Sequence, residues 1–509
     1  MLSTVADLLA VPADRHGDNP AVIDGGQVVT YRQLLDQARS CAASLTQRAE
    51  PGDRVALLLP RSAQTLAVFF GAQLAGLVPV FVHEQLRPRQ VAHIVGHAQA
   101  ALAVTTTRLR PLLRDCPLPE AQILGPDDLV VRGPALERRR IGRDLAMLTY
   151  TSGSTGTPKG IMVSHTNLIA GALIVADYLH LSAADRTLAL LPWSFDYGLN
   201  QVLATFAAGG TIVVGRSAFP PDICRALTAA DVTGLAGVPT LWAALTGPHS
   251  PFTRQRYPHL RYVTNSGGHL PAPAIQALRA AHPRTGVYAM YGLTEAFRST
   301  YLTPDLTDTK PASVGRPVPD SDVLILDDSG HRCPPGVIGQ IVHRGPTVAL
   351  GYWRDPDATA TVFRPHPFAP AGAVPETVVY SGDYGHLDDD GDLHLAGRRD
   401  ELLKVRGVRV TLGEIEAEIM ASGLTAAAVA TAADNGETDP VLLAAIQPRD
   451  HTFQLARLQD YCRDELPAYM RPAHLHVMDP LPCTPHGKPD RAAIAHHLER
   501  AFAAQTGQP

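Results

Sequence analysis

The ten residues Thr151–Gly160 read TSGSTGTPKG and follow directly on the strand-like run Leu145–Tyr150. Three glycines, three threonines, two serines and one lysine bring backbone N–H groups, hydroxyls and an ammonium group into one short stretch. Glycine lets the backbone approach a bound group closely, and Lys159 adds a point charge. A polyphosphate needs such donors, whereas the GxxxxGK[ST] spacing of a Walker A loop is absent. The stretch therefore predicts a mobile phosphate-binding loop of a different kind.

The sequence around this loop alternates between strand-like and helix-like segments. Continuous apolar runs of strand length, such as Arg54–Pro60 and Val232–Val238, alternate with segments of helical spacing, such as Tyr31–Gln47. This alternation predicts an α/β fold with a parallel sheet that is covered on both faces. From Val323 to about Leu395, short β-like runs are cut by Gly, Pro and Asp, which predicts a barrel-like or sandwich-like subdomain. A further αβ unit is expected from about Asp400 to the end.

Length and composition narrow the class of protein. The 509 residues exceed the roughly 250–300 at which a single core stops growing, so two or more domains are expected. Hydrophobic residues make up 45% and charged residues 18%, which excludes a disordered or charge-driven chain. The net charge of -5 gives no indication of a nucleic-acid or membrane partner.

The cysteines and the apolar segments indicate the cellular compartment in which the protein is expected. The six cysteines lie at least 21 positions apart, which excludes a CxxC metal or redox site and does not resemble a disulfide framework. The first residues lack a basic region followed by a long apolar run, so no signal peptide is expected. The most apolar stretch, Ala67–Val82, is shorter than the ~20 residues of a membrane-spanning helix. We therefore expect a cytoplasmic protein.

Four further motifs follow the loop along the chain. They read YGLTEA at Tyr291–Ala296, YSGDYG at Tyr380–Gly385, GRRDELLKVRGVRVTLGEIE at Gly397–Glu416, and HGKPDR at His486–Arg491. Together with TSGSTGTPKG they resemble, in kind and in order, the signatures of the adenylate-forming superfamily. This superfamily comprises the acyl-CoA synthetases, the luciferases and the adenylation domains of peptide synthetases.

The resemblance implies a fold of two domains. Residues 1–397 would form a large N-terminal domain of parallel-rich sheets covered by helices, with a β-barrel-like subdomain. Residues 398–509 would form a small, mobile α+β lid domain that rotates between two half-reactions, with Asp400 at the hinge. Lys404–Gly413 would then enter the site for thioester formation, where Gly407 allows a close approach of the backbone.

The chemistry implied is attack of a carboxylate on the α-phosphorus of ATP, giving an acyl-adenylate and pyrophosphate, with ATP and Mg²⁺ as cofactors. By resemblance, Glu295 holds the Mg²⁺, Thr151 and Lys159 contact phosphates, and Lys488 bridges carboxylate and α-phosphate oxygens. Asp383 takes the ribose hydroxyls, because a carboxylate accepts two hydrogen bonds. The other residues expected to bind the nucleotide are Ser152, Gly153, Ser154, Thr155, Gly156, Gly267, Gly268, Tyr291, Gly292, Thr294 and Arg398.

The stretch Leu191–Gln201, LPWSFDYGLNQ, bears on the substrate. Acyl- and aryl-CoA ligases commonly carry a histidine here, whereas Phe195-Asp196 resembles amino-acid-activating members in which the aspartate pairs with the substrate ammonium group. A carboxylate in a pocket is costly to bury without a cation, which fits an amine substrate. Alternatively, Asp196 pairs with a protein group or only orders its loop.

Arg298, in Ala296–Ser299, would offer a fixed guanidinium to a second substrate carboxylate, and Ser266 could add a hydroxyl. The pattern resembles stand-alone β-amino-acid adenylation enzymes of macrolactam antibiotic pathways, such as the one that activates 3-methylaspartate. It is also similar to ligases described only as acyl-CoA synthetases, and Arg298 could instead form a structural ion pair. The expected substrate-binding residues are Asp196, Tyr197, Asn200, Asn265, Ser266, Met290 and Arg298.

The function expected from these motifs is activation of an amino acid to its aminoacyl-AMP, followed by transfer to a phosphopantetheine thiol. No LGGxS-type carrier site follows Arg491, so a separate carrier protein is expected in trans. The alternative is an acyl-CoA ligase that uses free coenzyme A. A catalytically dead binding module is disfavoured by the intact motif residues Lys159, Glu295, Asp383 and Lys488.

Overall fold

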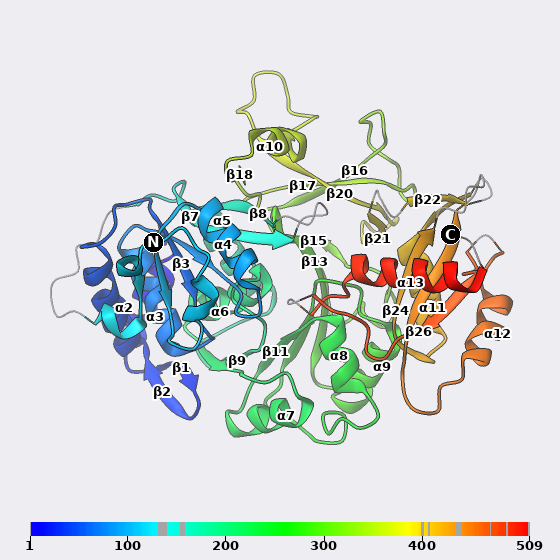
Figure 1. The fold of residues 1–509 in the computed structure, drawn as a ribbon, viewed down its shortest axis with the longest axis horizontal. Coiled ribbons are helices and arrows are strands. Elements are labelled where there is room, and N and C mark those ends of the chain that lie inside the picture. Colours follow the sequence, from blue (N-terminus) through cyan, green and yellow to red (C-terminus); the bar gives the residue numbers. More distant parts are fainter. Residues whose placement is uncertain are drawn as a thin grey trace.

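The computed structural model describes residues 2–130, 140–152, 158–398, 402–405, 408–433, 440–468, 470–484 and 487–506. Figure 1 shows the N-terminal elements on the left, the middle of the chain in the centre and the C-terminal part on the right. A smaller antiparallel sheet lies along the top of this view. None of the helices in the described ranges combines the length and the apolar composition that a bilayer-crossing segment requires.

The largest sheet has nine strands in the order β15-β14-β13-β12-β11-β9-β10-β1-β2. The neighbouring strands β1, β10, β9, β11, β12 and β13 pair in parallel. At the two ends of the sheet, β2, β14 and β15 pair antiparallel. The strands span Pro20–Asp24 (β1), Gln27–Thr30 (β2), Arg186–Ala189 (β9), Thr211–Val214 (β10), Gly234–Gly237 (β11), Tyr262–Asn265 (β12), Gly286–Leu293 (β13), Ala296–Leu302 (β14) and Arg316–Pro317 (β15).

Three further sheets complete the large part of the molecule. A parallel sheet, β4-β3-β5-β6, precedes the antiparallel sheet β18-β8-β7, and the five-stranded antiparallel sheet β16-β17-β20-β19 with β21 follows them. Their strands span Arg54–Leu58 (β3), Val78–Phe81 (β4), Ala100–Thr105 (β5), Ile123–Leu124 (β6), Leu145–Ser152 (β7), Pro158–Ser164 (β8), Asp322–Leu326 (β16), Gly339–Arg344 (β17), Gly351–Tyr352 (β18), Phe363–Pro365 (β19), Thr377–Leu387 (β20) and Leu393–Arg398 (β21).

Helices cover these sheets because their apolar faces need a partner. They span Asp7–His16 (α1), Tyr31–Leu45 (α2), Ala63–Leu74 (α3), Pro88–His97 (α4), His165–Tyr178 (α5), Asp196–Ala207 (α6), Pro220–Ala229 (α7), Pro239–Thr246 (α8), Ala272–Ala281 (α9) and Pro356–Val362 (α10). The helix expected over Tyr31–Gln47 is α2, which begins at a capping box in which Thr30 accepts from the Gln33 N–H group.

The C-terminal part is a small α+β unit. A hairpin, β22 (Leu402–Val405) and β23 (Val408–Thr411), precedes a three-stranded sheet of β24 (Thr425–Ala433), β25 (Val441–Pro448) and β26 (His474–Val477). Its helices span Leu412–Ala421 (α11), Leu455–Glu465 (α12) and Arg491–Thr506 (α13), and α13 lies across the sheet in Figure 1. The expected hinge residue Asp400 and Gly407 lie outside the described residues, and the boundary at 397/398 stays a prediction.

Helix α6 fixes the inner edge of the functional site because it is buried between two cores. Its Phe206 packs on Tyr31 and Phe70, with ring centres 5.3 and 5.7 Å away, in one core. Its Tyr197 belongs to the other core. The helix is therefore held on both sides, and its first residue, Asp196, has a fixed position.

The start of α6 also requires a glycine. A Cβ atom on Gly198 would overlap the carbonyl oxygen of Pro192 and lie 2.9 Å from that of Leu191. Both neighbours are backbone atoms, so neither can move without displacing the segment that leads into Asp196. The close approach of this segment to the helix thus depends on the absence of a side chain.

We expect Gly198→Ala to destabilise the protein by about 1–3 kcal/mol, because overpacking against backbone cannot be relieved locally. Gly96→Ala in α4 is the matched control: its Cβ would lie 3.4 Å from Pro117 Cγ, an ordinary contact. The control should be neutral or stabilising by about 0.5–1 kcal/mol, because alanine favours helices over glycine. Thermal unfolding of both variants checks this, and equal midpoints would contradict it.

Candidate active site

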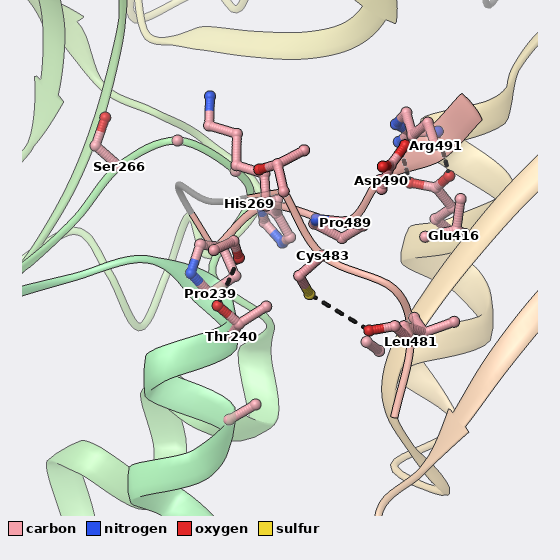
Figure 2. Close-up of a pocket in the computed structure, with 18 of the residues that line it drawn as sticks. Pro239, Thr240, Ser266, His269, Glu416, Leu481, Cys483, Pro489, Asp490 and Arg491 are labelled. Atoms are coloured by element: carbon pink, nitrogen blue, oxygen red, sulfur yellow. Dashed lines mark hydrogen bonds and ion pairs between the residues drawn. The ribbon is translucent and has the colours of Figure 1, made fainter. Parts of the chain in front are cut away.

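A cleft of about 2320 Å³ runs between the large N-terminal part and the C-terminal unit, and residues of both line it. Figure 2 shows one region of this cleft, with Pro239, Thr240 and Ser266 on one side and Glu416, Asp490 and Arg491 on the other. The sequence-predicted residues that line it are Thr151, Lys159, Asp196, Tyr197, Ser266, Gly267, Gly268, Met290, Tyr291, Gly292, Thr294, Glu295, Arg298, Asp383 and Lys488.

The stem of the predicted phosphate loop is an antiparallel strand pair. In β7 and β8, Thr151 pairs with Lys159 and Tyr150 pairs with Gly160. The loop residues Gly153, Ser154, Thr155 and Gly156 lie outside the described residues, and of Ser152 only the backbone is described. The stem thus brings Thr151 and Lys159 to the cleft from opposite strands.

Helix α4 holds this stem from behind. Nε2 of His93 lies 3.1 Å from the carbonyl oxygen of Pro158, and Nδ1 of His97 lies 2.8 Å from the hydroxyl of Tyr150. Because a carbonyl oxygen only accepts, Nε2 of His93 carries the proton in this contact. Sequence reasoning did not single out these histidines, since two histidines at i and i+4 have no characteristic context.

Glu295 and Lys159 meet at one aromatic side chain. The Tyr352 hydroxyl donates to Glu295 Oε1 at 2.6 Å, and Lys159 Nζ lies 5.2 Å from the centre of the Tyr352 ring. Asp355 Oδ2 lies 3.8 Å from the same ammonium group. Burial raises the pKa of the Glu295 carboxyl, and the nearby charges of Asp196 and Asp383 raise it further. A carboxylate in such surroundings is stabilised by a bound cation.

Tyr352 was not a sequence candidate. It lies in the stretch Gly351–Trp353, GYW, and its side chain is 8% exposed. A tyrosine in apolar surroundings is typical of a core residue, and the hydroxyl contact to Glu295 is made across 57 positions of the chain. Only the tertiary structure reveals this contact.

Asp383 lines the cleft and is held there by a tyrosine. The Tyr291 hydroxyl donates to its Oδ2 at 2.5 Å, and the Asp383 backbone pairs with that of Arg398 across β20 and β21. The Arg398 side chain lies outside the described residues. Both Tyr291 and Asp383 line the cleft, so the hydrogen bond from Tyr291 orients a carboxylate that faces the space a nucleotide would fill.

Lys488 reaches the cleft from the C-terminal unit. The preceding residue, Gly487, accepts a hydrogen bond through its carbonyl from Thr240 Oγ1 at 2.8 Å. Lys488 Nζ lies 5.6 Å from the centre of the Phe195 ring, and a Cβ atom on Gly267 would be 3.1 Å from Lys488 Cε. The lysine therefore crosses the Ser266–Gly268 turn, and Gly267, at a φ of 82°, leaves room for it.

Asp196 is the first residue of α6, where the helix dipole favours a negative charge. Its Oδ1 accepts from the Tyr197 N–H group at 2.6 Å. Within the described residues, no cation forms an ion pair with its carboxylate, although the residue is half-buried and lines the cleft. The carboxylate is thus available to a cationic group in the cleft.

Arg298 is the most unusual residue of the cleft. It is 3% exposed, its φ is 85°, and its guanidinium carbon lies 4.7 Å from the centre of the Tyr197 ring. Its Nε has no hydrogen-bond partner, and no carboxylate among the described residues forms an ion pair with it. A positive φ at a non-glycine residue is strained and clusters at functional sites. The strained backbone thus holds a buried positive charge that forms no ion pair with any described part of the chain.

Two predicted substrate residues do not line the cleft. Asn265 donates from Nδ2 to the Gly268 carbonyl at 2.8 Å and so braces the turn beneath Lys488. Asn200 lies one helical turn beyond Asp196, about 6 Å further along α6, and borders a small cavity behind the cleft.

The donor set fits the expected nucleotide and metal ion. Mg²⁺ prefers carboxylate oxygens and phosphates, and Glu295 is a carboxylate whose surroundings disfavour its negative charge. Lys159 and Lys488 approach the same cleft from different parts of the chain. The residues present therefore suit a polyphosphate with a divalent cation.

Comparison with known proteins identifies the class of protein. The model of the AMP-binding enzyme family matches residues 9–353, and that of the AMP-binding enzyme C-terminal domain matches residues 414–488. The chain therefore belongs to the AMP-binding enzyme family, which confirms the adenylate-forming resemblance and identifies an AMP-forming ligase. ATP and Mg²⁺ are the cofactors of this family.

Particular relatives add detail. Novobiocin biosynthesis protein H of Streptomyces niveus is 31% identical over 521 residues, covering 99% of this chain and 84% of that protein. Tyrocidine synthase 3 of Brevibacillus parabrevis is 30% identical over 498 residues, covering 96% of this chain. The chain spans only 8% of the length of that synthase.

The solved structures establish the fold. The anthranilate CoA ligase AuaEII in complex with anthranoyl-AMP superposes with a TM-score of 0.89 at 24% identity, with 99% of each chain covered. O-succinylbenzoate coenzyme A synthetase from Bacillus subtilis, solved with ATP and magnesium ion, gives 0.83 at 24% identity over 96% of this chain and 99% of that one. They confirm the expected α/β fold with a large N-terminal and a smaller C-terminal domain.

We expect Tyr352→Phe to weaken MgATP binding by about ten-fold or more, because a hydrogen bond to a charged group contributes about 1.5–3 kcal/mol. The phenyl ring remains beneath Lys159, so the substitution removes the hydroxyl that donates to Glu295 and keeps the ring contact. Titration calorimetry with MgATP measures it.

The matched control is Tyr257→Phe, which removes a hydroxyl that donates to Gln255 Oε1 at 3.0 Å, at a position that does not line the cleft. The control should bind MgATP as the wild type does. Equal affinities for Tyr352→Phe and the wild type would contradict the role assigned to Tyr352.

Proposed function

We propose that this protein uses ATP and Mg²⁺ to activate an amino acid that carries a second carboxylate, and then transfers the aminoacyl group to the phosphopantetheine thiol of a separate carrier protein. The observation that carries the proposal is the pair Asp196 and Arg298. One is a carboxylate and the other a buried guanidinium, both line one cleft, and neither has an oppositely charged partner among the described residues.

Charge complementarity supports this substrate class. Burial of an unpaired charge costs several kcal/mol, so a cleft that presents a half-buried carboxylate and a buried guanidinium is suited to a ligand that neutralises both. An ammonium group would pair with Asp196, and a carboxylate would pair bidentately with Arg298. An aspartate-like β-amino acid such as 3-methylaspartate, as used in macrolactam biosynthesis, carries both groups beside the carboxylate that reacts.

The chain's own residues would divide the adenylation step among them. Lys488 would hold the reacting carboxylate next to the α-phosphate, whose bond to pyrophosphate breaks as the new C–O–P link forms. Lys159 and Thr151 would hold the leaving phosphates, and Asp383 the ribose hydroxyls. Glu295, oriented by Tyr352, would hold the Mg²⁺, which when bound neutralises phosphate charge.

An acyl-CoA ligase that uses free coenzyme A is the alternative. The names of the structural neighbours include CoA ligases and synthetases, which favours it. A substrate of that kind, with no ammonium group and no second carboxylate, would leave Asp196 and Arg298 without an oppositely charged partner. The two functions can therefore be distinguished by testing which carboxylic acids support ATP–pyrophosphate exchange.

We expect ATP–pyrophosphate exchange with 3-methylaspartate and aspartate, weaker exchange with neutral β-amino acids, and none with benzoate or a medium-chain fatty acid. Arg298→Met should reduce the preference for the dicarboxylic substrates at least ten-fold, since a charge-assisted hydrogen bond contributes about 1.5–3 kcal/mol. Asp196→Asn should instead lower activity with every amino acid. Exchange with the fatty acid or benzoate alone would overturn the proposal in favour of the CoA ligase.

We expect Lys488→Ala to lower the rate of adenylate formation about 10²–10³-fold, the usual loss for one preorganised charge at the reacting atoms. Arg500→Ala removes a cation from the exposed face of α13 in the same unit and is the matched control, with no change expected. Single-turnover formation of the adenylate measures both. A loss of only a few-fold for Lys488→Ala would contradict its assignment.

A further inference from the structure

A second, much smaller cavity of about 20 Å³ lies behind the wall of the cleft. Tyr197, Met290 and Arg298 line both spaces and so form the wall between them. Helices α5 and α6 and strands β9, β11 and β12 close the other sides. A single water molecule needs about 10–15 Å³ of such space, so the cavity has room for one water and nothing larger.

Three buried polar atoms of its lining residues have no hydrogen-bond partner in the part of the chain that the structure describes. They are Asn200 Oδ1, Gln201 Oε1 and Arg298 Nε, in side chains that are 2%, 8% and 3% exposed. An unsatisfied buried polar group costs about 1–3 kcal/mol, so three around one small space would be a considerable loss. Gln201 Nε2 donates to the Tyr197 carbonyl at 3.3 Å, which fixes the side-chain oxygen as the unpaired atom.

The hydroxyl groups around the cavity are paired with one another. Thr205 donates to Thr187 Oγ1 at 2.8 Å, and Thr187 Oγ1 lies 3.1 Å from the Tyr262 hydroxyl. The Tyr197 hydroxyl lies 2.5 Å from Thr264 Oγ1. The buried lining atoms that lack a partner among the described residues are two acceptors and one donor, and a water molecule, with two O–H donors and free lone pairs, is their complement.

We propose that this cavity holds one buried water molecule, which donates to Asn200 and Gln201 and accepts from Arg298 Nε. Asn200 and Gln201 are then positioning residues for the guanidinium. The water site follows from the cavity alone, whereas its effect on the substrate rests on the proposed function.

The water supplies a restraint that Arg298 otherwise lacks. The guanidinium packs on the rings of Tyr197 and Phe297, with its carbon 4.7 and 5.7 Å from their centres. Packing on ring faces sets the distance of the guanidinium from the rings but leaves the side-chain torsions free to slide it over them. A hydrogen bond from Nε restrains that movement, so the terminal N–H groups keep one orientation for a carboxylate that accepts two of them from the cleft.

The first test is a crystal structure of the full-length wild-type protein at a resolution that shows ordered water. We expect one oxygen within hydrogen-bond distance of Asn200 Oδ1, Gln201 Oε1 and Arg298 Nε. An empty cavity, or side chains that pair directly with one another, would overturn the water site. This result needs no substrate, so it stands apart from the proposed function.

The second test measures selectivity. Asn200→Leu and Gln201→Met should raise KM for the dicarboxylic amino acid about five- to ten-fold, leave kcat nearly unchanged, and leave both constants for a neutral amino acid as they are. Thr205→Val, which removes a paired hydroxyl from the same cavity wall, is the matched control and should not change selectivity. In an Arg298→Met background the effect of Asn200→Leu should disappear.

The outcomes distinguish the two proposals. If no dicarboxylic amino acid is activated, the proposed function fails and the crystal structure alone decides the water site. If dicarboxylic amino acids are activated and Asn200→Leu has the selectivity of the wild type, the positioning role fails and the proposed function stands.

Discussion

The hydrogen bond from Tyr352 to Glu295 joins the parts of the molecule on which the site depends. Tyr352 belongs to β18, which pairs with the strand that carries Lys159, whereas Glu295 lies in the turn between β13 and β14 of the nine-stranded sheet. A backbone hydrogen bond from the Ala349 N–H group to the Glu295 carbonyl, at 2.8 Å, reinforces the same junction. The two sheets, which share one hydrophobic core, are thereby joined at the point where Lys159 and Glu295, the residues proposed to hold a phosphate and the metal ion, line the cleft.

The cleft carries more charge than its protein contacts neutralise. Asp196 and Arg298 have no ionic partner among the described residues, and burial, followed by the nearby carboxylates of Asp196 and Asp383, raises the pKa of Glu295. Such an arrangement costs stability in the free protein, and the two packed cores around α6 offset that cost. Binding of oppositely charged ligand groups offsets this cost. The unpaired charges therefore indicate which ligand charges the site favours.

The C-terminal unit contributes to the site through few contacts. Thr240 and Gly487 share one hydrogen bond, the rings of His249 and His451 stack with centres 6.2 Å apart, and Lys488 crosses a glycine turn. Polar and limited contacts between two units are typical of interfaces that open and close. The structure thus accommodates Lys488 in the cleft without burying it, which is compatible with the lid movement expected from the sequence.

The sequence by itself indicated the family and the α/β fold, and it predicted the site residues that stand in local motifs, namely Lys159, Glu295, Asp383 and Lys488, all of which line the cleft. Such residues stand beside glycines or in unusual dipeptides, so a short stretch of sequence is enough to reveal them. The tertiary structure alone decided which residues support them. Tyr352 meets Glu295 from 57 positions away, and a hydrogen bond between distant segments leaves no periodic or local signal. It also decided that Asn200 lies behind the cleft, because depth along α6 depends on how the helix is packed rather than on which residues it contains.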